Sequence, residues 1–181
     1  MGERRNVVHN RSVSLQSVGF LYPELRERHF CSIKNLIKLQ GGEYIALERL
    51  ESTYKSCQLV SNICVHAVPD ATQPIAIIHP HEVHLRAAFP DEGSHTSLGD
   101  LCANPKVNAL ILKECNATGK KSGFKSIEML QAVVLTAEEW TPESGLVTAA
   151  QKLQRKKIGQ RYEAEILVRF FFLLSCRAHA D

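Results

Sequence analysis

The sequence predicts a chain of mixed α and β structure, because strand-like and helix-like patterns alternate along it. Three stretches carry this prediction: residues 34–57, two short apolar runs at 62–68 and 74–79, and a segment that begins at Asn104–Pro105. With 181 residues, the chain corresponds to one domain with or without tails. A domain of this size buries enough surface to fold without disulfides or a metal.

Residues 34–57 have the pattern of a strand, a glycine turn and a helix. The apolar run Leu36–Leu39 has the length of a strand, and Gly41–Gly42 ends it because glycine adopts positive φ without strain. The following apolar residues have the spacing of one helix face: Leu47, Leu50, Tyr54 and Cys57. A glycine turn of this kind exposes backbone N–H groups, so it is either a ligand-binding loop or a plain connector.

The centre of the chain predicts a hairpin followed by a helix. Residues 62–68 and 74–79 are typical of strands, and the turn-rich segment between them joins two antiparallel neighbours. We expect a short helix over His81–Ala88 and a loop over 89–99, where proline and glycine recur.

A second helix is predicted from Asn104–Pro105, because asparagine caps helices and proline fits the first turn. Its apolar face continues to Cys115. Beyond it we expect helical structure over 127–131, a short buried strand over 132–135 and a turn region over 138–145.

Bulk composition excludes several classes of protein. The net charge of +3 does not by itself indicate nucleic-acid binding. None of the six cysteines forms a Cys-x-x-Cys pair, so neither a zinc knuckle nor a redox pair is indicated. The first ten residues are charged and no apolar stretch follows them. We therefore expect no secretory signal and a cytoplasmic location.

Two motifs resemble the adenylate-forming enzymes, and most closely the fungal long-chain fatty-acid–CoA ligases. Lys-Asn-Leu-Ile-Lys from Lys34, followed by Gly-Glu-Tyr-Ile-Ala-Leu-Glu-Arg-Leu-Glu from Gly42, resembles the hinge and lid motif of that family. Leu146–Ile158 resembles the motif that carries its adenylation lysine. The resemblance divides the chain into an unmatched extension (1–30), a lid domain (31–158) and an unmatched apolar tail (159–181).

The resemblance implies an α+β fold with a small, mostly antiparallel sheet and packed helices. It also implies the C-terminal lid of a ligase that uses ATP and Mg²⁺ to activate a fatty acid as its acyl-adenylate, then transfers it to CoA. The implied partner is a large N-terminal domain that holds the ATP and acyl sites, so we expect this chain alone to be inactive and to bind no cofactor tightly. The alternative is a non-catalytic binding domain, or a truncated remnant of such a ligase.

The resemblance also assigns residue roles. Lys34 falls on the hinge, and Lys152 falls on the catalytic lysine of the adenylation step. The loop toward the CoA path falls on four residues: Gly41, Gly42, Glu43 and Tyr44. From charge alone, the favoured interpretation of Lys152 is a solvated lysine in a basic run with Arg155, and only the motif resemblance reverses that preference. Ser32 replaces the arginine that faces ATP phosphates in the family motif, and this favours the non-catalytic alternative.

Other features carry weaker hypotheses. His81 and His84 could share a helix face, but they are one residue short of a His-Glu-x-x-His motif, so we expect surface histidines and no metal site. The apolar run 166–174 is too short to span a bilayer and suits a docking helix or a peripheral membrane contact. Binding of nucleic acid or an acidic membrane through the basic run near Lys152 is disfavoured by the small net charge.

Overall fold

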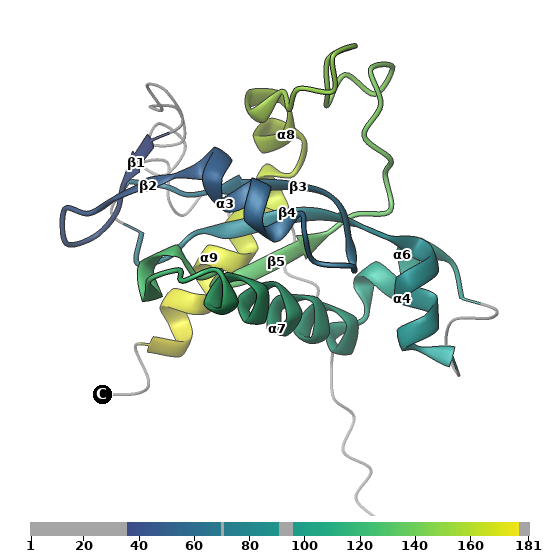
Figure 1. Cartoon of the computed structure of the whole chain (residues 1–181), viewed down its shortest axis with the longest axis horizontal. Helices are drawn as coiled ribbons and strands as arrows, with labels where there is room; N and C mark the ends of the chain where they lie inside the picture. The colour runs from purple at the N-terminus through teal and green to yellow at the C-terminus, as the bar shows by residue number, and fades with distance from the viewer. Residues whose placement is uncertain (1–35, 70, 91–95, 178–181) are drawn as a thin grey trace, which may run out of the picture.

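The computed structural model describes residues 36–69, 71–90 and 96–177 and shows an α+β fold (Figure 1). Lys34, Ser32 and the N-terminal extension lie outside the described residues. Within the described ranges, no helix is both long enough and apolar enough to cross a membrane.

The described strands form two small sheets. β1 (Leu36–Lys38) and β2 (Tyr44–Ala46) form an antiparallel hairpin in which Ile37 lies opposite Ile45. The second sheet has the order β3-β4-β5, built from β3 (Val60–His66), β4 (Ile75–Pro80) and β5 (Ala132–Leu135). β3 and β4 are antiparallel, as the sequence predicts, whereas β5 joins β4 in parallel. The expectation of a small, mostly antiparallel sheet with packed helices is confirmed.

Helices surround these sheets. They are α3 (Leu47–Tyr54), α4 (Glu82–Ala88), α6 (Leu98–Ala103), α7 (Pro105–Lys121), the 3₁₀ turn η1 (Ser126–Glu128), α8 (Arg155–Arg161) and α9 (Glu163–Arg177). The predicted start of α7 is confirmed, because the Asn104 side chain accepts a hydrogen bond from the Lys106 N–H and Pro105 occupies the first turn.

The structure differs from the sequence reading in three short segments. Gly41–Gly42 does not lead directly into α3, because β2 lies between them and pairs back on β1. A strand of three residues is too short to show alternation in the sequence. α6 begins at Leu98 inside the predicted loop, where the Ser97 hydroxyl caps it by accepting from the Asp100 N–H at 3.1 Å. Over 127–131, only the turn η1 is helical.

The sheet β3-β4-β5 is covered on both faces. Ile63 and Ile78 pack in one apolar cluster with α3 and α7, whereas Cys64 and Ile77 pack in a second cluster with α8 and α9. This division follows from the alternation of side chains along a strand. The second cluster includes Tyr162 and Ile166, both buried, so α9 belongs to the folded core although it follows the matched motif.

One glycine of α7 makes a close helix contact. A Cβ atom at Gly119 would lie 2.9 Å from Phe124 Cδ2 and 3.2 Å from Tyr54 Cε1. The Tyr54 and Phe124 rings pack edge to face at 5.4 Å. The absence of a side chain at Gly119 therefore lets α7 approach these two rings.

Gly119→Ala is expected to lower the free energy of unfolding by about 1–2 kcal/mol, because overpacking outweighs the gain in helix propensity. Urea denaturation of the 181-residue chain measures it. Gly99→Ala is the matched control, since its nearest contact would be Ser97 Oγ at 3.7 Å and alanine should leave stability equal or slightly higher. Equal stability of Gly119→Ala and the wild type would contradict the close packing.

Candidate functional site: two faces of one domain

The hairpin turn between β1 and β2 requires glycine. Gly41 and Gly42 have φ angles of +91° and +83°, in the left-handed region that L side chains rarely adopt. The turn is closed by two hydrogen bonds, from the Leu39 N–H to the Glu43 carbonyl (2.8 Å) and from the Gly42 N–H to the Leu39 carbonyl (3.1 Å). Beside it, the Tyr44 side chain is 64% exposed. The turn is thus closed by its own backbone hydrogen bonds and exposed at Tyr44.

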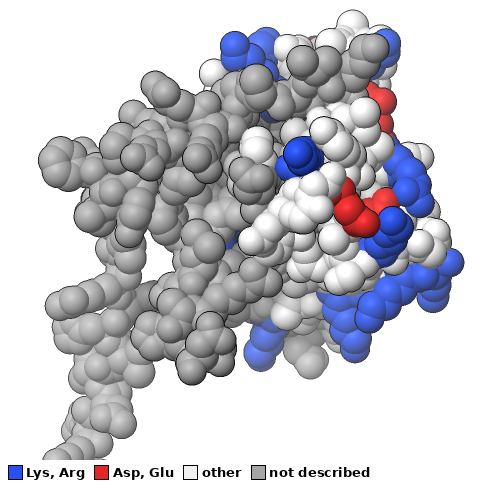
Figure 2. All heavy atoms as spheres, turned by 90° about the vertical axis from the view of Figure 1, so that its left-hand side faces the viewer, with Lys and Arg blue, Asp and Glu red and all other residues white. Residues whose placement is uncertain are grey.

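A pocket of about 350 Å³ lies next to this turn. It is lined by Gly42, Glu43, Tyr44, Arg49, Gly123, Lys125, Ile127 and Glu128. Its acidic side chains are paired, because Lys125 Nζ lies 3.6 Å from Glu43 and Arg49 Nη1 lies 2.6 Å from Glu128. Figure 2 views the side of the molecule where the hairpin lies and shows more Lys and Arg than acidic side chains on its described surface. The charges that line the pocket itself are balanced, with Arg49 and Lys125 against Glu43 and Glu128.

Lys152 lies on a structured loop. Val147 and Leu153 form an isolated antiparallel bridge, and the Thr148 N–H donates to the Lys152 carbonyl at 2.9 Å. The Lys152 N–H in turn donates to Thr148 Oγ1 at 3.2 Å. The side chain of Lys152 is exposed at a second pocket, of about 620 Å³. Its other lining residues are Glu48, Glu51, Leu153 and Arg155.

Arg155 does not belong to the solvated basic run in which the sequence places it. Its Nη2 donates to Glu51 Oε2 at 2.6 Å, and its Nη1 donates to Glu51 Oε1. Burial raises the pKa of the Glu51 carboxyl, although the Arg155 guanidinium acts in the opposite direction. The sequence carries a signal for the burial of Glu51, though not for its partner, since Glu51 follows Leu47 by one helix turn and so lies on the apolar face of α3.

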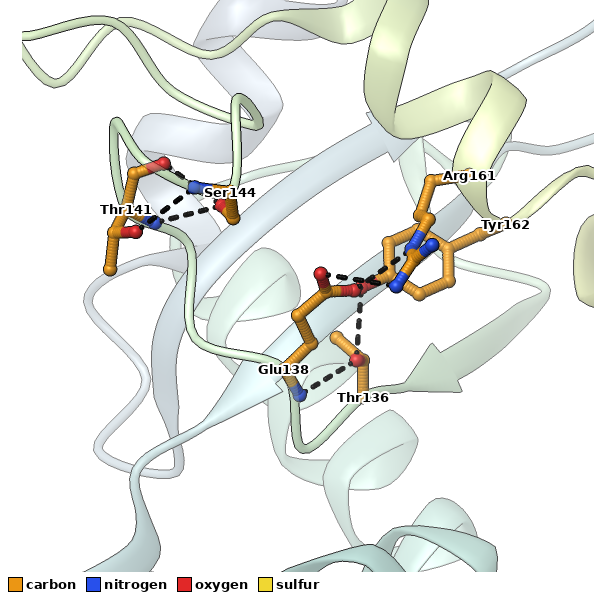
Figure 3. Close-up of polar contacts among 6 residues, drawn as sticks. All are labelled: Thr136, Glu138, Thr141, Ser144, Arg161 and Tyr162. Carbon is orange, nitrogen blue, oxygen red and sulfur yellow. Dashed lines mark hydrogen bonds and ion pairs between the residues drawn. The ribbon is translucent and has the colours of Figure 1, made fainter.

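A polar cluster at the C-terminal end of α8 was not predicted from the sequence (Figure 3). Tyr162 donates to Glu138 Oε2 at 2.8 Å, and Arg161 Nε donates to the same oxygen at 3.1 Å. The Thr136 hydroxyl lies 3.0 Å from the Tyr162 hydroxyl. The hydrogen bond from Tyr162 holds the pKa of the Glu138 carboxyl below its ordinary value, with further lowering by Arg161. The cluster joins the end of β5 to the α8–α9 junction.

The structure does not bring Lys152 and the glycine turn into one site. The pocket beside the hairpin and the pocket beside Lys152 share no lining residue. Both adjoin α3, however, because β2 runs directly into that helix and Glu51 on it binds Arg155. In Figure 1 the hairpin lies at the left and α8 at the top. The domain therefore presents two functional candidates on separate faces.

His81 and His84, the two histidines considered as metal ligands, lie side by side at the start of α4. The rings of His81 and His84 stack with centroids 4.2 Å apart, and His84 Nδ1 lies 2.7 Å from the Gln58 carbonyl oxygen. Across the part of the chain that the structure describes, no three His, Cys, Asp or Glu side chains gather where a metal ion could bind.

Comparisons with known proteins find long-chain-fatty-acid–CoA ligases as relatives of this chain. It is 47% identical over 152 residues to long-chain-fatty-acid–CoA ligase 1 of Schizosaccharomyces pombe, across 82% of this chain and 22% of that protein. It is 42% identical over 128 residues to ligase 4 of Saccharomyces cerevisiae, across 69% of this chain and 18% of that protein. The chain is related to the fungal long-chain-fatty-acid–CoA ligases. The resemblance inferred from the two motifs is confirmed, and the chain spans about a fifth of the length of these ligases.

Solved structures agree with the fold. The fold matches the didomain of a carboxylic acid reductase from Segniliparus rugosus, solved with AMP, at a TM-score of 0.66 and 23% identity. The match covers 80% of this chain and 18% of that one. It also matches the adenylation domain of a carboxylate reductase from Mycobacterium chelonae, at a TM-score of 0.62 and 25% identity, over 76% and 19% of the two chains. No family model matches the sequence.

Proposed function

We propose that this chain acts as the C-terminal lid of a long-chain fatty-acid–CoA ligase and uses its two faces in two successive half-reactions. The observation that carries the proposal is the exposed Lys152 on a hydrogen-bonded loop, in a chain 47% identical to a ligase of this class. The separation of Lys152 from the glycine turn supports it, because each face can meet the active site in turn only if the lid rotates. The hinge for this rotation is assigned to Lys34.

Lys152 serves the first half-reaction. A fatty-acid carboxylate oxygen attacks the α-phosphorus of ATP, the acyl–phosphate bond forms, and pyrophosphate leaves. The two reactants are both anions, so the ammonium of Lys152 between them stabilises the charge that accumulates in the transition state. Because its side chain is exposed, Lys152 can reach a substrate held by another domain.

The glycine turn serves the second half-reaction. The thiol of CoA attacks the acyl carbon, the thioester forms, and AMP leaves. Gly41 and Gly42 lack side chains and so leave room for the narrow pantetheine arm, with Glu43 and Tyr44 beside it. The surplus of Lys and Arg on this side complements the phosphates of CoA.

The large N-terminal domain is the proposed partner, and it would hold ATP and the fatty acid. The described residues do not fit Mg²⁺, because Glu43 and Glu128 beside the hairpin are already ion-paired and no group of three acidic, Cys or His ligands converges. No step is therefore assigned to a metal bound by this chain.

A cytoplasmic location with contact to a membrane surface through residues 166–174 is part of the same proposal. Val168 is 47% exposed and is available for such a contact, whereas Ile166 is buried in the core. No role in nucleic-acid binding is proposed.

The alternative is a non-catalytic remnant. One observation favours it: Ser32 stands where the family motif has a phosphate-facing arginine. A serine hydroxyl does not replace a fixed guanidinium toward phosphate.

Fatty-acid-dependent exchange between ATP and pyrophosphate tests the proposal. The 181-residue chain alone is expected to show none. Grafting residues 32–177 with Ser32→Arg onto the large domain of a fungal ligase should restore exchange, because α9 is included and the core is complete. Exchange by the chain alone, above a Lys152→Ala control, would show that the ATP site lies within it. A folded graft without exchange would favour the non-catalytic alternative.

A further inference from the structure

The ion pair between Glu51 and Arg155 is a buried link between the Lys152 segment and the rest of the domain. Arg155 is the first residue of α8 and follows Lys152 by three positions. The Glu51 and Arg155 side chains are only 9% and 21% exposed. Glu51 Oε1 also accepts from the Val65 N–H of β3 at 2.8 Å. The two-point geometry and the extra hydrogen bond distinguish this pair from a surface salt bridge.

The Lys152 loop depends on such a link. Gln151 has a φ of +57°, and among the described residues it is the only residue other than glycine with positive φ. Such a conformation persists only where the surrounding structure holds it. The hydrogen bonds of Gln151 and Lys152 to Thr148 are internal to the loop, so they fix its shape but not its place on the domain. Burial of Val147 holds the first half of the loop. The Gln154 N–H ties the second half to the Leu146 carbonyl at 2.9 Å, and Arg155 joins that half to α3.

We infer that Glu51 and Arg155 are positioning residues that hold Lys152 for acyl-adenylate formation, an inference that rests on the proposed role of Lys152. A catalytic charge that moves by about 1 Å loses much of its effect, so the anchor matters to the rate. The glycine hairpin has other supports, because the Gln40 N–H donates to the Ala71 carbonyl at 3.0 Å and Lys125 Nζ lies 3.6 Å from Glu43. Breaking the pair should therefore release Lys152 and leave the hairpin in place.

Amide hydrogen exchange of the 181-residue chain tests the anchor directly. Arg155→Gln is expected to accelerate exchange over residues 148–154 by about tenfold or more, while β1 and β2 keep wild-type rates. Arg155→Lys should give an intermediate result, because lysine keeps the charge but not the two-point contact. Arg161→Gln is the matched control: it removes the ion pair with Glu138 at the other end of α8 and should not change the loop. Wild-type exchange of the loop in folded Arg155→Gln would overturn the inference.

A double variant tests the anchor if Arg155→Gln alone unfolds the chain. Glu51→Gln with Arg155→Met removes both charges, and the glutamine oxygen can still accept from the Val65 N–H. This double variant is expected to fold and to show the same fast exchange over 148–154. Wild-type protection of the loop in the double variant would show that the loop holds itself, and the inference would fail.

The catalytic half of the inference needs the grafted ligase. There, Arg155→Gln should slow acyl-adenylate formation by about tenfold or more and leave thioester formation from supplied acyl-adenylate near wild type. A released loop with an unchanged adenylation rate would refute the proposed role of Lys152 while leaving the anchor intact. Slow adenylation with a fixed loop would refute the anchor instead.

Discussion

Lys152→Ala in the grafted ligase is expected to slow acyl-adenylate formation by about a hundredfold or more, which is typical for the loss of one oriented charge in a transition state. Thioester formation from supplied acyl-adenylate should stay close to wild type, because the pocket beside the hairpin does not include Lys152. The two rates are measured separately, by pyrophosphate exchange and by acyl-CoA production. The fold should be preserved, since the Lys152 side chain is exposed.

Lys157→Ala is the matched control for this result. Lys157 is also exposed and lies in the same basic run, five residues after Lys152. If the slower adenylation of Lys152→Ala came only from the loss of positive charge near the loop, Lys157→Ala should slow adenylation equally. Equal effects of the two substitutions would show that Lys152 is an ordinary solvated surface lysine.

Gly42→Leu is expected to have the opposite profile. A Cβ atom there would lie 3.8 Å from Lys38 Cε, and the leucine side chain would fill the space assigned to pantetheine, so thioester formation should fall by about a hundredfold while adenylation persists. The substitution also places leucine at a φ of +83°, which costs about 1–2 kcal/mol. Acyl-CoA production from supplied acyl-adenylate measures blockage of the CoA path, and a urea denaturation curve measures the loss of stability.

Gly145→Leu controls for that backbone strain. Gly145 has a φ of +72°, and a Cβ atom there would meet only the flexible Lys157 side chain, at 3.5 Å. It should lose similar stability without a selective loss of thioester formation. Should Gly42→Leu and Gly145→Leu slow both half-reactions alike, the glycine turn would be a structural connector only.

Local patterns predicted the elements that depend on local chemistry. The cap at Asn104 and the alternation in β3 and β4 act over a few neighbouring residues, so the sequence displays them directly. The parallel pairing of β5 with β4 was not predictable in this way. The two strands are far apart in the sequence, and the packing of the helices between them decides how they pair. β2 was missed for another reason, since its only buried residue is Ile45.

The candidate site shows the same division. Motif resemblance assigned Lys152 and the glycine turn, and the structure gives each of them a fixed backbone. The partner of Arg155 could not be read from the sequence, since Glu51 lies 104 residues away and the contact exists only when α3 and α8 pack on the same strand. The basic run in the sequence therefore predicted a solvated Arg155, whereas in the structure its side chain is mostly buried against Glu51.

The chain contains a single tryptophan, Trp140, and it is 2% exposed in the cluster that also holds Leu146 and Ile158. Those neighbours flank the Lys152 loop on both sides, so the indole is a built-in optical probe of that segment. A rotation of the whole domain as a rigid body leaves its surroundings, and hence its emission wavelength, unchanged. Loosening of the segment admits water and shifts the emission to the red. Fluorescence thus separates movement of the lid from damage to it without any added label.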